Sequence, residues 1–374
     1  MMKRTTLLLL LFTVAVIAMM PAQKLTKDLD NFFKAHLSEN PDQPVANILV
    51  YLENEKKDFV YHKGFGNLSV SDDTAVSPNS PFKIASITKL FTATLMLQLV
   101  EEGKLKLDDP IISLIGDQTF VGFDKLMMLD GKNFGHDITV RQLLNHTSGL
   151  ADIFTDTQEE FMNLIFENPQ KQWSVKDLFE TYYQFGLHHR AHFRPGDSFY
   201  YSDMNYFLLG LIIEKYRAMP LVEAYRTYIL EPVGMSHTYL EYHEAATNTL
   251  AFPSLYMGDI EVNTNINTSF DWAGGGLVST TYDLNLFMKA LFGKQLIKQD
   301  HLFQAMITDS RDRYGFGMFL YDFDGLRFYG HSGFWGSDVF YNPEAGITMV
   351  VSVNQTHLPY KHYEFVNGMY QLIK

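Results

Sequence analysis

Strand-like segments lie near both ends of the 374-residue chain, and helical patterns fill its middle. Residues 45–53 and 59–67 read as two strands joined by a charged turn, which is typical of a β-hairpin. Four more strand-like runs lie near the C-terminus, at residues 317–321, 326–329, 338–341 and 347–353. This order predicts an α/β (α+β) fold: an antiparallel sheet built from both termini, with flanking helices and an inserted, mostly helical region.

Helical periodicity marks the rest of the chain. The expected helices cover residues 24–37, 86–102, 140–144, 158–166, 175–185, 206–216, 221–230, 282–291 and 360–373. We therefore expect one domain over residues 24–374. Within it, residues 24–104 and 273–374 would form the part that contains the sheet, and residues 105–272 the helical part.

The charge and composition of the chain exclude several classes of function. The formal net charge is −13, with 43 acidic and 30 basic residues. Binding to nucleic acid or to anionic lipid needs a basic face, so we expect neither partner. The chain has no cysteine, which rules out a thiol nucleophile and a cysteine-based zinc site. We expect no metal and no cofactor, and a small molecule or a peptide as substrate.

The first 22 residues have the pattern of a secretory signal peptide. Lys3 and Arg4 precede an uncharged, mostly apolar run to Met20, and Ala22 offers a small residue for cleavage. Met20 lies where a second small residue is preferred, so a short uncleaved anchor stays an alternative. Either case predicts a periplasmic or secreted protein, and no later segment is apolar and long enough to span a bilayer.

The segment Ser86-Ile87-Thr88-Lys89 opens the strongest predicted helix. Ser and Lys three residues apart lie on the same helical face, so the amine can reach the hydroxyl. A serine needs a nearby base to act as a nucleophile at neutral pH, and a helix N-terminus favours developing negative charge. The pattern indicates a nucleophilic Ser86 with Lys89 beside it, although a helix-capping serine also fits. The same spacing in Ser80-Pro81-Phe82-Lys83 lies in a Pro-interrupted loop with no helix after it.

Two further segments contain candidate site residues. Tyr201-Ser202-Asp203 leads into a predicted helix, and a tyrosine there can carry a proton if nearby cations favour its phenolate; aromatic packing is the alternative. His331-Ser332-Gly333 directly follows the predicted strand 326–329, where a backbone N–H can bind an oxyanion. An ordinary turn is the alternative there.

Two other patterns are weaker. Residues 330–334 resemble a Gly-x-Ser-x-Gly nucleophile elbow, but Phe334 replaces the last glycine and no helix follows. The cluster of His188, His189 and His192 lacks a metal-binding spacing and contains Arg190, so a solvated loop is the preferred interpretation.

Together, the three ordered motifs resemble those of the penicillin-recognising serine enzymes: Ser-x-x-Lys, a Tyr-x-Asn triplet and Lys-Thr-Gly. The branch with class C β-lactamases, DD-peptidases and related esterases is the most similar. The segments that carry the resemblance are residues 82–89 (Phe-Lys-Ile-Ala-Ser-Ile-Thr-Lys), 139–150 (Thr-Val-Arg-Gln-Leu-Leu-Asn-His-Thr-Ser-Gly-Leu), 195–210, 232–235 (Pro-Val-Gly-Met), 274–280 and 330–333 (Gly-His-Ser-Gly). The likeness runs from about residue 32 to the C-terminus and implies a β-lactamase/transpeptidase-like fold.

The resemblance also implies roles for individual residues. Ser86 would be acylated, Lys89 would hold the proton network, and Tyr201 would act as general base and then as general acid. The N–H groups of Ser86 and Phe334 would form the oxyanion hole. The substrate would contact Asp203, His331, Ser332, Gly333 and Phe334.

Two departures from the family pattern bear on the substrate. Asp203 replaces the usual Asn and, when ionised, cannot donate a hydrogen bond to a substrate amide. His331 replaces the usual Lys, and we expect only a partial charge on it near neutral pH. Both changes favour an esterase, amidase or D-amino-acid peptidase over a true class C-like β-lactamase, which stays the second hypothesis. The third is a penicillin-binding-like receptor that binds peptidoglycan fragments without turnover. The sequence does not reveal the particular substrate or the oligomeric state.

Overall fold

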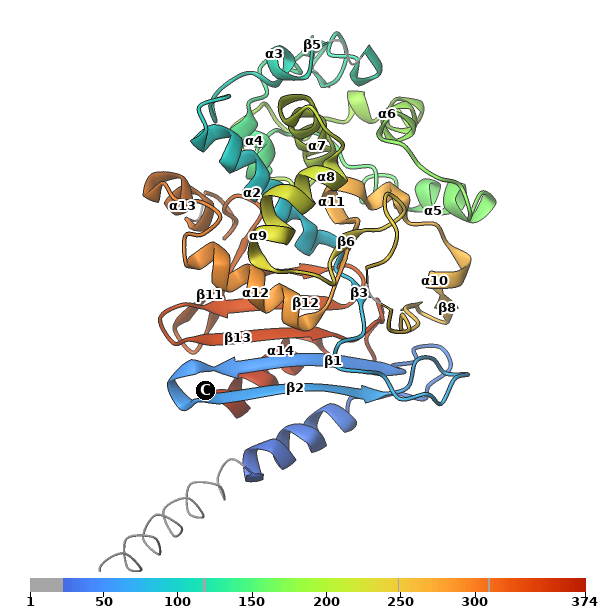
Figure 1. Cartoon of the computed structure of the whole chain (residues 1–374). Helices are drawn as coiled ribbons and strands as arrows, with labels where there is room; N and C mark the ends of the chain where they lie inside the picture. Colours follow the sequence, from blue (N-terminus) through green and yellow to red (C-terminus); the bar gives the residue numbers. More distant parts are fainter. Residues whose placement is uncertain (1–22, 117–118, 248, 309) are drawn as a thin grey trace, which may run out of the picture.

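A computed structural model describes residues 23–116, 119–247, 249–308 and 310–374. The predicted signal peptide, residues 1–22, lies outside the described residues. Six strands form one antiparallel sheet in the order β10-β11-β12-β13-β1-β2 (Figure 1). Their bounds are β1 Asn47–Asn54, β2 Phe59–Gly66, β10 Phe319–Phe323, β11 Leu326–Gly333, β12 Ser337–Asn342 and β13 Ile347–Ser352. The predicted sheet built from both termini is thus confirmed.

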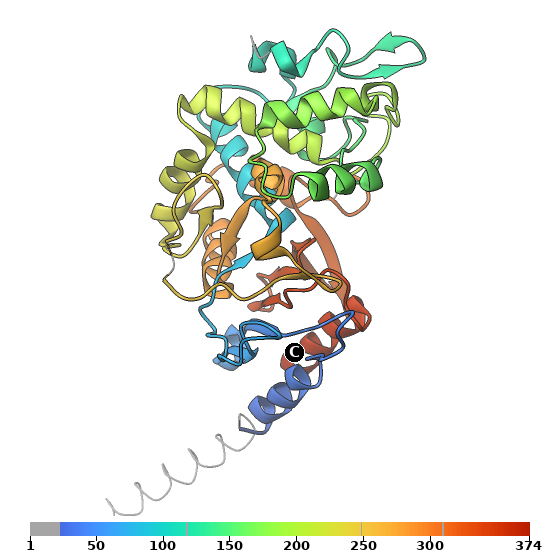
Figure 2. The ribbon, with the colours of Figure 1, turned by 90° about the vertical axis from the view of Figure 1, so that its right-hand side faces the viewer.

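Both faces of the sheet are buried at its centre, because consecutive residues in the middle of β1, β12 and β13 are mostly apolar and buried. In β1, Val50 faces a core that includes the helix over residues 23–34 and α14 (His362–Ile373), whereas Tyr51 faces the opposite core. The two terminal helices pack side by side, with the rings of Phe32 and Phe365 stacked at 5.5 Å (Figure 2).

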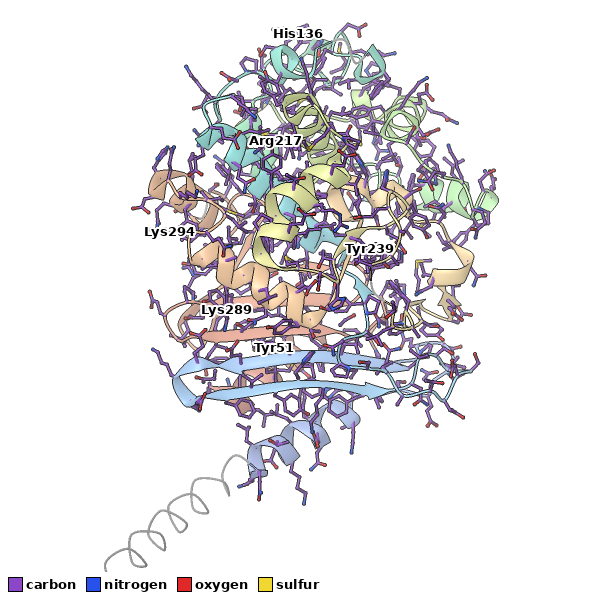
Figure 3. The ribbon with its side chains drawn as sticks, viewed as in Figure 1. Tyr51, His136, Arg217, Tyr239, Lys289 and Lys294 are labelled. Atoms are coloured by element: carbon purple, nitrogen blue, oxygen red, sulfur yellow. The ribbon has the colours of Figure 1, made fainter. Side chains whose placement is uncertain are left out.

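Helix α12 (Thr281–Phe292) covers the other face of the sheet and separates it from the helical region (Figure 1). Its Lys289 pairs with Glu53 of β1 at 2.8 Å, close to Tyr51 in Figure 3. Successive side chains of β1 point to opposite faces of the sheet. One set therefore packs against the terminal helices, and the other set packs against α12 and the helices beyond it.

The helical region surrounds two long buried helices, α2 (Thr88–Glu101) and α7 (Asp203–Arg217). They pack together, and Arg217 of α7 donates to both carboxylate oxygens of Glu102 at 2.8 Å (Figure 3). The remaining helices are α3 Ile111–Ile115, α4 Val140–Leu144, α5 Gln158–Glu167, α6 Val175–Gln184, α8 Leu221–Tyr225, α9 Glu231–Val233, α10 Val262–Asn265, α11 Trp272–Gly275 and α13 Asp300–Ile307.

Small sheets connect these parts. Strands β3 (Phe82–Lys83), β9 (Leu277–Ser279) and β6 (Tyr239–Leu240) form a three-stranded sheet, and two short hairpins are β4 (Met128–Leu129) with β5 (Lys132–Asn133) and β7 (Tyr256–Met257) with β8 (Ile260–Glu261). The domain boundaries at residues 104/105 and 272/273 stay a prediction. Among the described residues, no helix is long and apolar enough to cross a membrane.

Candidate active site

Ser86 lies in a short 3-10 turn, η2 (Ala85–Ile87), immediately before α2. The sequence predicted that the α-helix begins at Ser86, whereas it begins at Thr88. Ala85 has a φ of +44°, a left-handed conformation that costs a non-glycine residue about 1–3 kcal/mol and often marks a functional site. The strained turn ends β3 abruptly and presents Ser86 at the N-terminus of a helix that is almost entirely buried.

The amine of Lys89 is fully buried and has three acceptors, the number of N–H groups of an ammonium. Its Nζ donates to Ser86 Oγ at 3.1 Å, to Asp203 Oδ1 at 2.5 Å and to the carbonyl oxygen of Gly274 at 2.9 Å. Three distant segments of the chain thus meet at this one amine, and its position against Ser86 is fixed on every side.

Asp203 begins α7 and connects Lys89 to a second carboxylate. Its backbone N–H donates to Asp152 Oδ1 at 2.7 Å, so Asp152 satisfies an N–H group that the helix leaves free. Burial, and then the charge of Asp203, raise the pKa of Asp152 to about 7. The other oxygen of Asp152 accepts from the N–H groups of Phe154 and Thr155 at 3.1 and 3.0 Å. One buried carboxyl group therefore holds both the start of α7 and the loop before α5.

Tyr201 lies beside Ser86 and Lys89, with Lys89 Nζ 4.9 Å from its ring centroid. Its buried hydroxyl makes no hydrogen bond of acceptable geometry within the described part of the chain. Burial, and then the charge of Asp203, raise the pKa of Tyr201 well above its ordinary value, while the side chain of Ser86 acts in the opposite direction. A neutral hydroxyl is therefore the stable form of this side chain, and a resting phenolate is disfavoured.

The ring of His146 packs against the ring of Tyr201. The two rings stack at 4.2 Å, and His146 Nδ1 accepts from the N–H of Ser202 at 3.1 Å and from the amide of Asn205 at 3.0 Å. Burial, and then the charges of Lys89 and His331, lower the pKa of His146 well below its ordinary value. The neutral imidazole thereby fixes the loop that carries Tyr201.

His331, Ser332 and Gly333 belong to β11, which continues through them instead of ending at residue 329. His331 is 2% exposed; its Nδ1 donates to the Ser332 carbonyl oxygen at 2.7 Å, and its Nε2 lies 3.4 Å from the Tyr314 hydroxyl. Burial, and then Lys89, lower the pKa of His331 to about 3. The expected partial charge near neutral pH is therefore wrong, because a buried ring beside a lysine cannot readily take up a proton.

The end of β11 packs tightly against the turn that carries Ser86. A Cβ on Gly333 would lie 2.3 Å from Ser337 Oγ and 2.5 Å from the carbonyl oxygen of Ile84, so only glycine fits. Beyond it, Phe334 is 56% exposed. Within the described ranges, the N–H groups of Ser86 and Phe334 donate to no protein acceptor. Both groups are thus free to bind an oxygen atom.

A pocket of about 300 Å³ opens beside Ser86. Most of its wall is apolar, and helix α5 and residues 257–271 contribute much of it. The lining residues are Ala85, Ser86, Phe154, Thr155, Gln158, Phe161, Met162, Ile165, Tyr201, Asp203, Met257, Ile266, Phe270, Asp271, Gly275, Phe334 and Trp335. Of the residues predicted from sequence, Ser86, Tyr201, Asp203 and Phe334 line the pocket. Lys89 and His331 are buried, and neither they nor Ser332 and Gly333 are among its described lining residues.

The other sequence candidates lie elsewhere. Lys83, the lysine of the second Ser-x-x-Lys match, donates to Glu241 and Thr268 instead of to Ser80. Of the histidine cluster, His192 pairs with Asp156 at 3.0 Å. Throughout the described ranges, no group of three or more His, Cys, Asp or Glu residues could hold a metal ion.

Comparison with known proteins agrees with this fold. Residues 36–367 match the family model described as Beta-lactamase. The chain therefore belongs to the β-lactamase family. It is 28% identical to Protein flp of Staphylococcus aureus (strain MW2) over 334 residues, which cover 84% of this chain and 61% of that protein. The chain thus spans about three fifths of the length of that relative.

Two solved structures illustrate the likeness in fold. The D-stereospecific amidohydrolase from Streptomyces sp. has a TM-score of 0.73 at 24% identity, over 90% of this chain and 97% of that chain. The penicillin-binding protein homologue from Pyrococcus abyssi has a TM-score of 0.70 at 26% identity, over 94% of this chain and 76% of that one.

Proposed function

We propose that the protein is a serine hydrolase that cleaves an ester or amide bond through an acyl-enzyme on Ser86. The observation that carries the proposal is the position of Lys89 Nζ, 3.1 Å from Ser86 Oγ at the wall of a pocket. A buried ammonium group that donates to a serine hydroxyl favours negative charge on the serine oxygen as its proton leaves, which activates the serine as a nucleophile.

The arrangement supports a sequence of steps. Ser86 Oγ attacks the substrate carbonyl carbon, and the N–H groups of Ser86 and Phe334 bind the oxygen on which negative charge develops. The proton of Ser86 passes through the hydroxyl of Tyr201 to the leaving group as the bond to that group breaks. Since burial disfavours the phenolate of Tyr201, we propose that Tyr201 accepts one proton as it gives up another. Water then attacks the acyl-enzyme by the reverse route and releases the acid.

Intact-mass spectrometry after exposure to a panel of reactive esters, β-lactams and D-Ala-D-Ala peptides tests the nucleophile. We expect an acyl adduct on the wild type and none on Ser86→Ala. Ser80→Ala is the matched control, because Ser80 has the same Ser-x-x-Lys spacing, and it should keep the adduct. An adduct on Ser86→Ala would refute the proposal.

The same panel separates the two alternatives. Rapid turnover of a cephalosporin would favour a true β-lactamase, a function that the neutral His331 argues against because it leaves no cation there for a substrate carboxylate. Binding of peptidoglycan fragments without any adduct would favour a non-catalytic receptor.

A further inference from the structure

The pocket beside Ser86 contains carboxylates but no cation. Its lining includes Asp203 and Asp271, and no Lys, Arg or His is among its described lining residues. Asp203 is already paired with Lys89 at 2.5 Å. The second carboxylate, Asp271, is used by none of the proposed steps of the reaction, and it lies in a wall that is otherwise largely aromatic and aliphatic.

Asp271 lies very close to the nucleophile turn. A Cβ on Gly275 would lie 3.3 Å from Asp271 Cγ and 3.5 Å from the carbonyl carbon of Ala85, so only this glycine separates the carboxylate from the residue before Ser86. Asp271 Oδ2 accepts from Trp335 Nε1 at 3.1 Å. Trp335 follows Phe334, whose N–H is proposed to bind the substrate oxygen. A group bound by Asp271 therefore lies near the substrate carbonyl.

Asp271 has no ion-pair partner within the described part of the chain. The two lysines whose charges act on it are used elsewhere, since Lys83 pairs with Glu241 and Lys89 with Asp203. Its Oδ1 makes no hydrogen bond to any described residue. Burial raises the pKa of Asp271 to about 7. A carboxylate left uncompensated in an apolar pocket is costly unless a ligand compensates it.

We propose that Asp271 binds a positively charged amine on the acyl part of the substrate. The substrate class is then an ester or amide of an amino acid with a free ammonium group and a large apolar side chain. The apolar side chain would occupy the wall formed by Phe154, Phe161 and Phe270. This inference rests on the proposed hydrolase function and specifies its substrate.

The same charges disfavour other substrates. A carboxylate on the acyl part would meet Asp271 and find no cation in the pocket, and a neutral acyl group would leave Asp271 uncompensated. The competing explanation is that Asp271 serves only to hold Trp335. That role requires a hydrogen-bond acceptor but no charge, so the two explanations can be separated.

The first experiment compares two substrates that differ only in the amine: phenylalanine methyl ester, as each enantiomer, and methyl 3-phenylpropanoate. We expect the wild type to have the higher kcat/KM for one phenylalanine enantiomer. Asp271→Asn keeps an acceptor for Trp335 but removes the charge, and it should lower the ratio of the two kcat/KM values about 10- to 100-fold. Asp259→Asn is the control: it removes an exposed charge from the turn between β7 and β8 and should keep the wild-type ratio.

The second experiment needs no variant. Inhibition of the wild type by 2-phenylethylamine, 2-phenylethanol and 3-phenylpropanoate should follow that order, with the amine strongest. An unchanged ratio in Asp271→Asn, or an inhibition order with the carboxylate first, would overturn the assignment of Asp271. Absence of turnover of every ester by the wild type would instead overturn the hydrolase function itself.

Discussion

The ion pair between Lys89 and Asp203 gives the most quantitative prediction. Lys89 is fully buried and Asp203 is 14% exposed, so water can replace neither partner. Removing one partner of such a pair costs about 3–5 kcal/mol. Asp203→Asn keeps an oxygen that can accept the Lys89 hydrogen bond, and this bond offsets about 1 kcal/mol of the cost of removing the charge. We therefore expect a coupling energy of roughly 2–4 kcal/mol between the two side chains.

A double-mutant cycle measures this coupling. The variants are Lys89→Met, Asp203→Asn and the double variant, each unfolded with urea at about pH 8 and followed by circular dichroism. At that pH Asp152 is mostly ionised, because its pKa is about 7. Loss of the Asp203 charge also removes its repulsion of the Asp152 carboxylate. This contribution cancels in the cycle, because it is present both in Asp203→Asn and in the double variant.

The pair Lys361 and Glu364 is the control, because its side chains are 81% and 66% exposed and should show no measurable coupling. A coupling energy below about 0.5 kcal/mol for Lys89 and Asp203 would refute the view that this carboxylate compensates the buried amine.

Three other predictions follow from particular residues. Gly333→Ala places a Cβ 2.3 Å from Ser337 Oγ; it should lower kcat for an ester about 100-fold or more by displacing the proposed oxyanion donors. Gly325→Ala, where nothing lies within 4 Å, should retain kcat. Asp271 has a folded-state pKa of about 7, raised from 3.8, so the folded protein holds a proton that the unfolded chain releases, and this lowers stability as pH rises through that window. The free energy of unfolding of Asp271→Asn, measured relative to the wild type in urea titrations, should therefore rise by roughly 2–4 kcal/mol between about pH 4 and pH 8. A difference that instead grows as the pH falls would contradict this. Finally, the mass of the protein exported by its host cell should show loss of residues 1–22, and an intact N-terminus would favour the anchor.

The sheet could be predicted from sequence because its strands are short runs rich in aromatic and β-branched residues, bounded by turns. Strand β1 begins two residues later than expected and β2 begins where expected. The C-terminal part of β11 was missed, since Gly330 to Gly333 has the composition of a turn. These residues stay in the strand because β12 pairs with them as far as Gly333 and Ser337.

The reactive part of the site could be inferred because its residues lie in short motifs. Ser86 and Lys89 are three residues apart, and the structure brings Tyr201 and Asp203 to them. The Gly274 carbonyl that completes the surroundings of Lys89 could not be found, because a backbone oxygen leaves no trace in residue type. His146 and Asp152 lie in or next to the segment 139–150 that carries the resemblance, so that segment was a signal, but it indicated no role.

Asp271 has no such signal. It lies 185 residues from Ser86 along the chain, in a segment without a recognisable motif. Its position near the nucleophile depends on Gly275 and on the three-stranded sheet that brings β3 and β9 together. Charge in a pocket is a property of the fold as a whole, which explains why the substrate was harder to infer than the chemistry.

The reacting groups and the pocket wall lie on different parts of the fold, and this difference has a consequence for how relatives of this protein diverge. The groups of the proposed reaction lie on or directly before buried elements. Ser86 lies in the turn η2 before α2, Tyr201 lies directly before α7, and most substitutions in these elements disturb packing. Much of the pocket wall comes from α5 and from residues 257–271, which join the body of the molecule through fewer buried side chains. Mutations that accumulate in these two segments can change the substrate of the proposed hydrolase while the proposed chemistry on Ser86 stays intact.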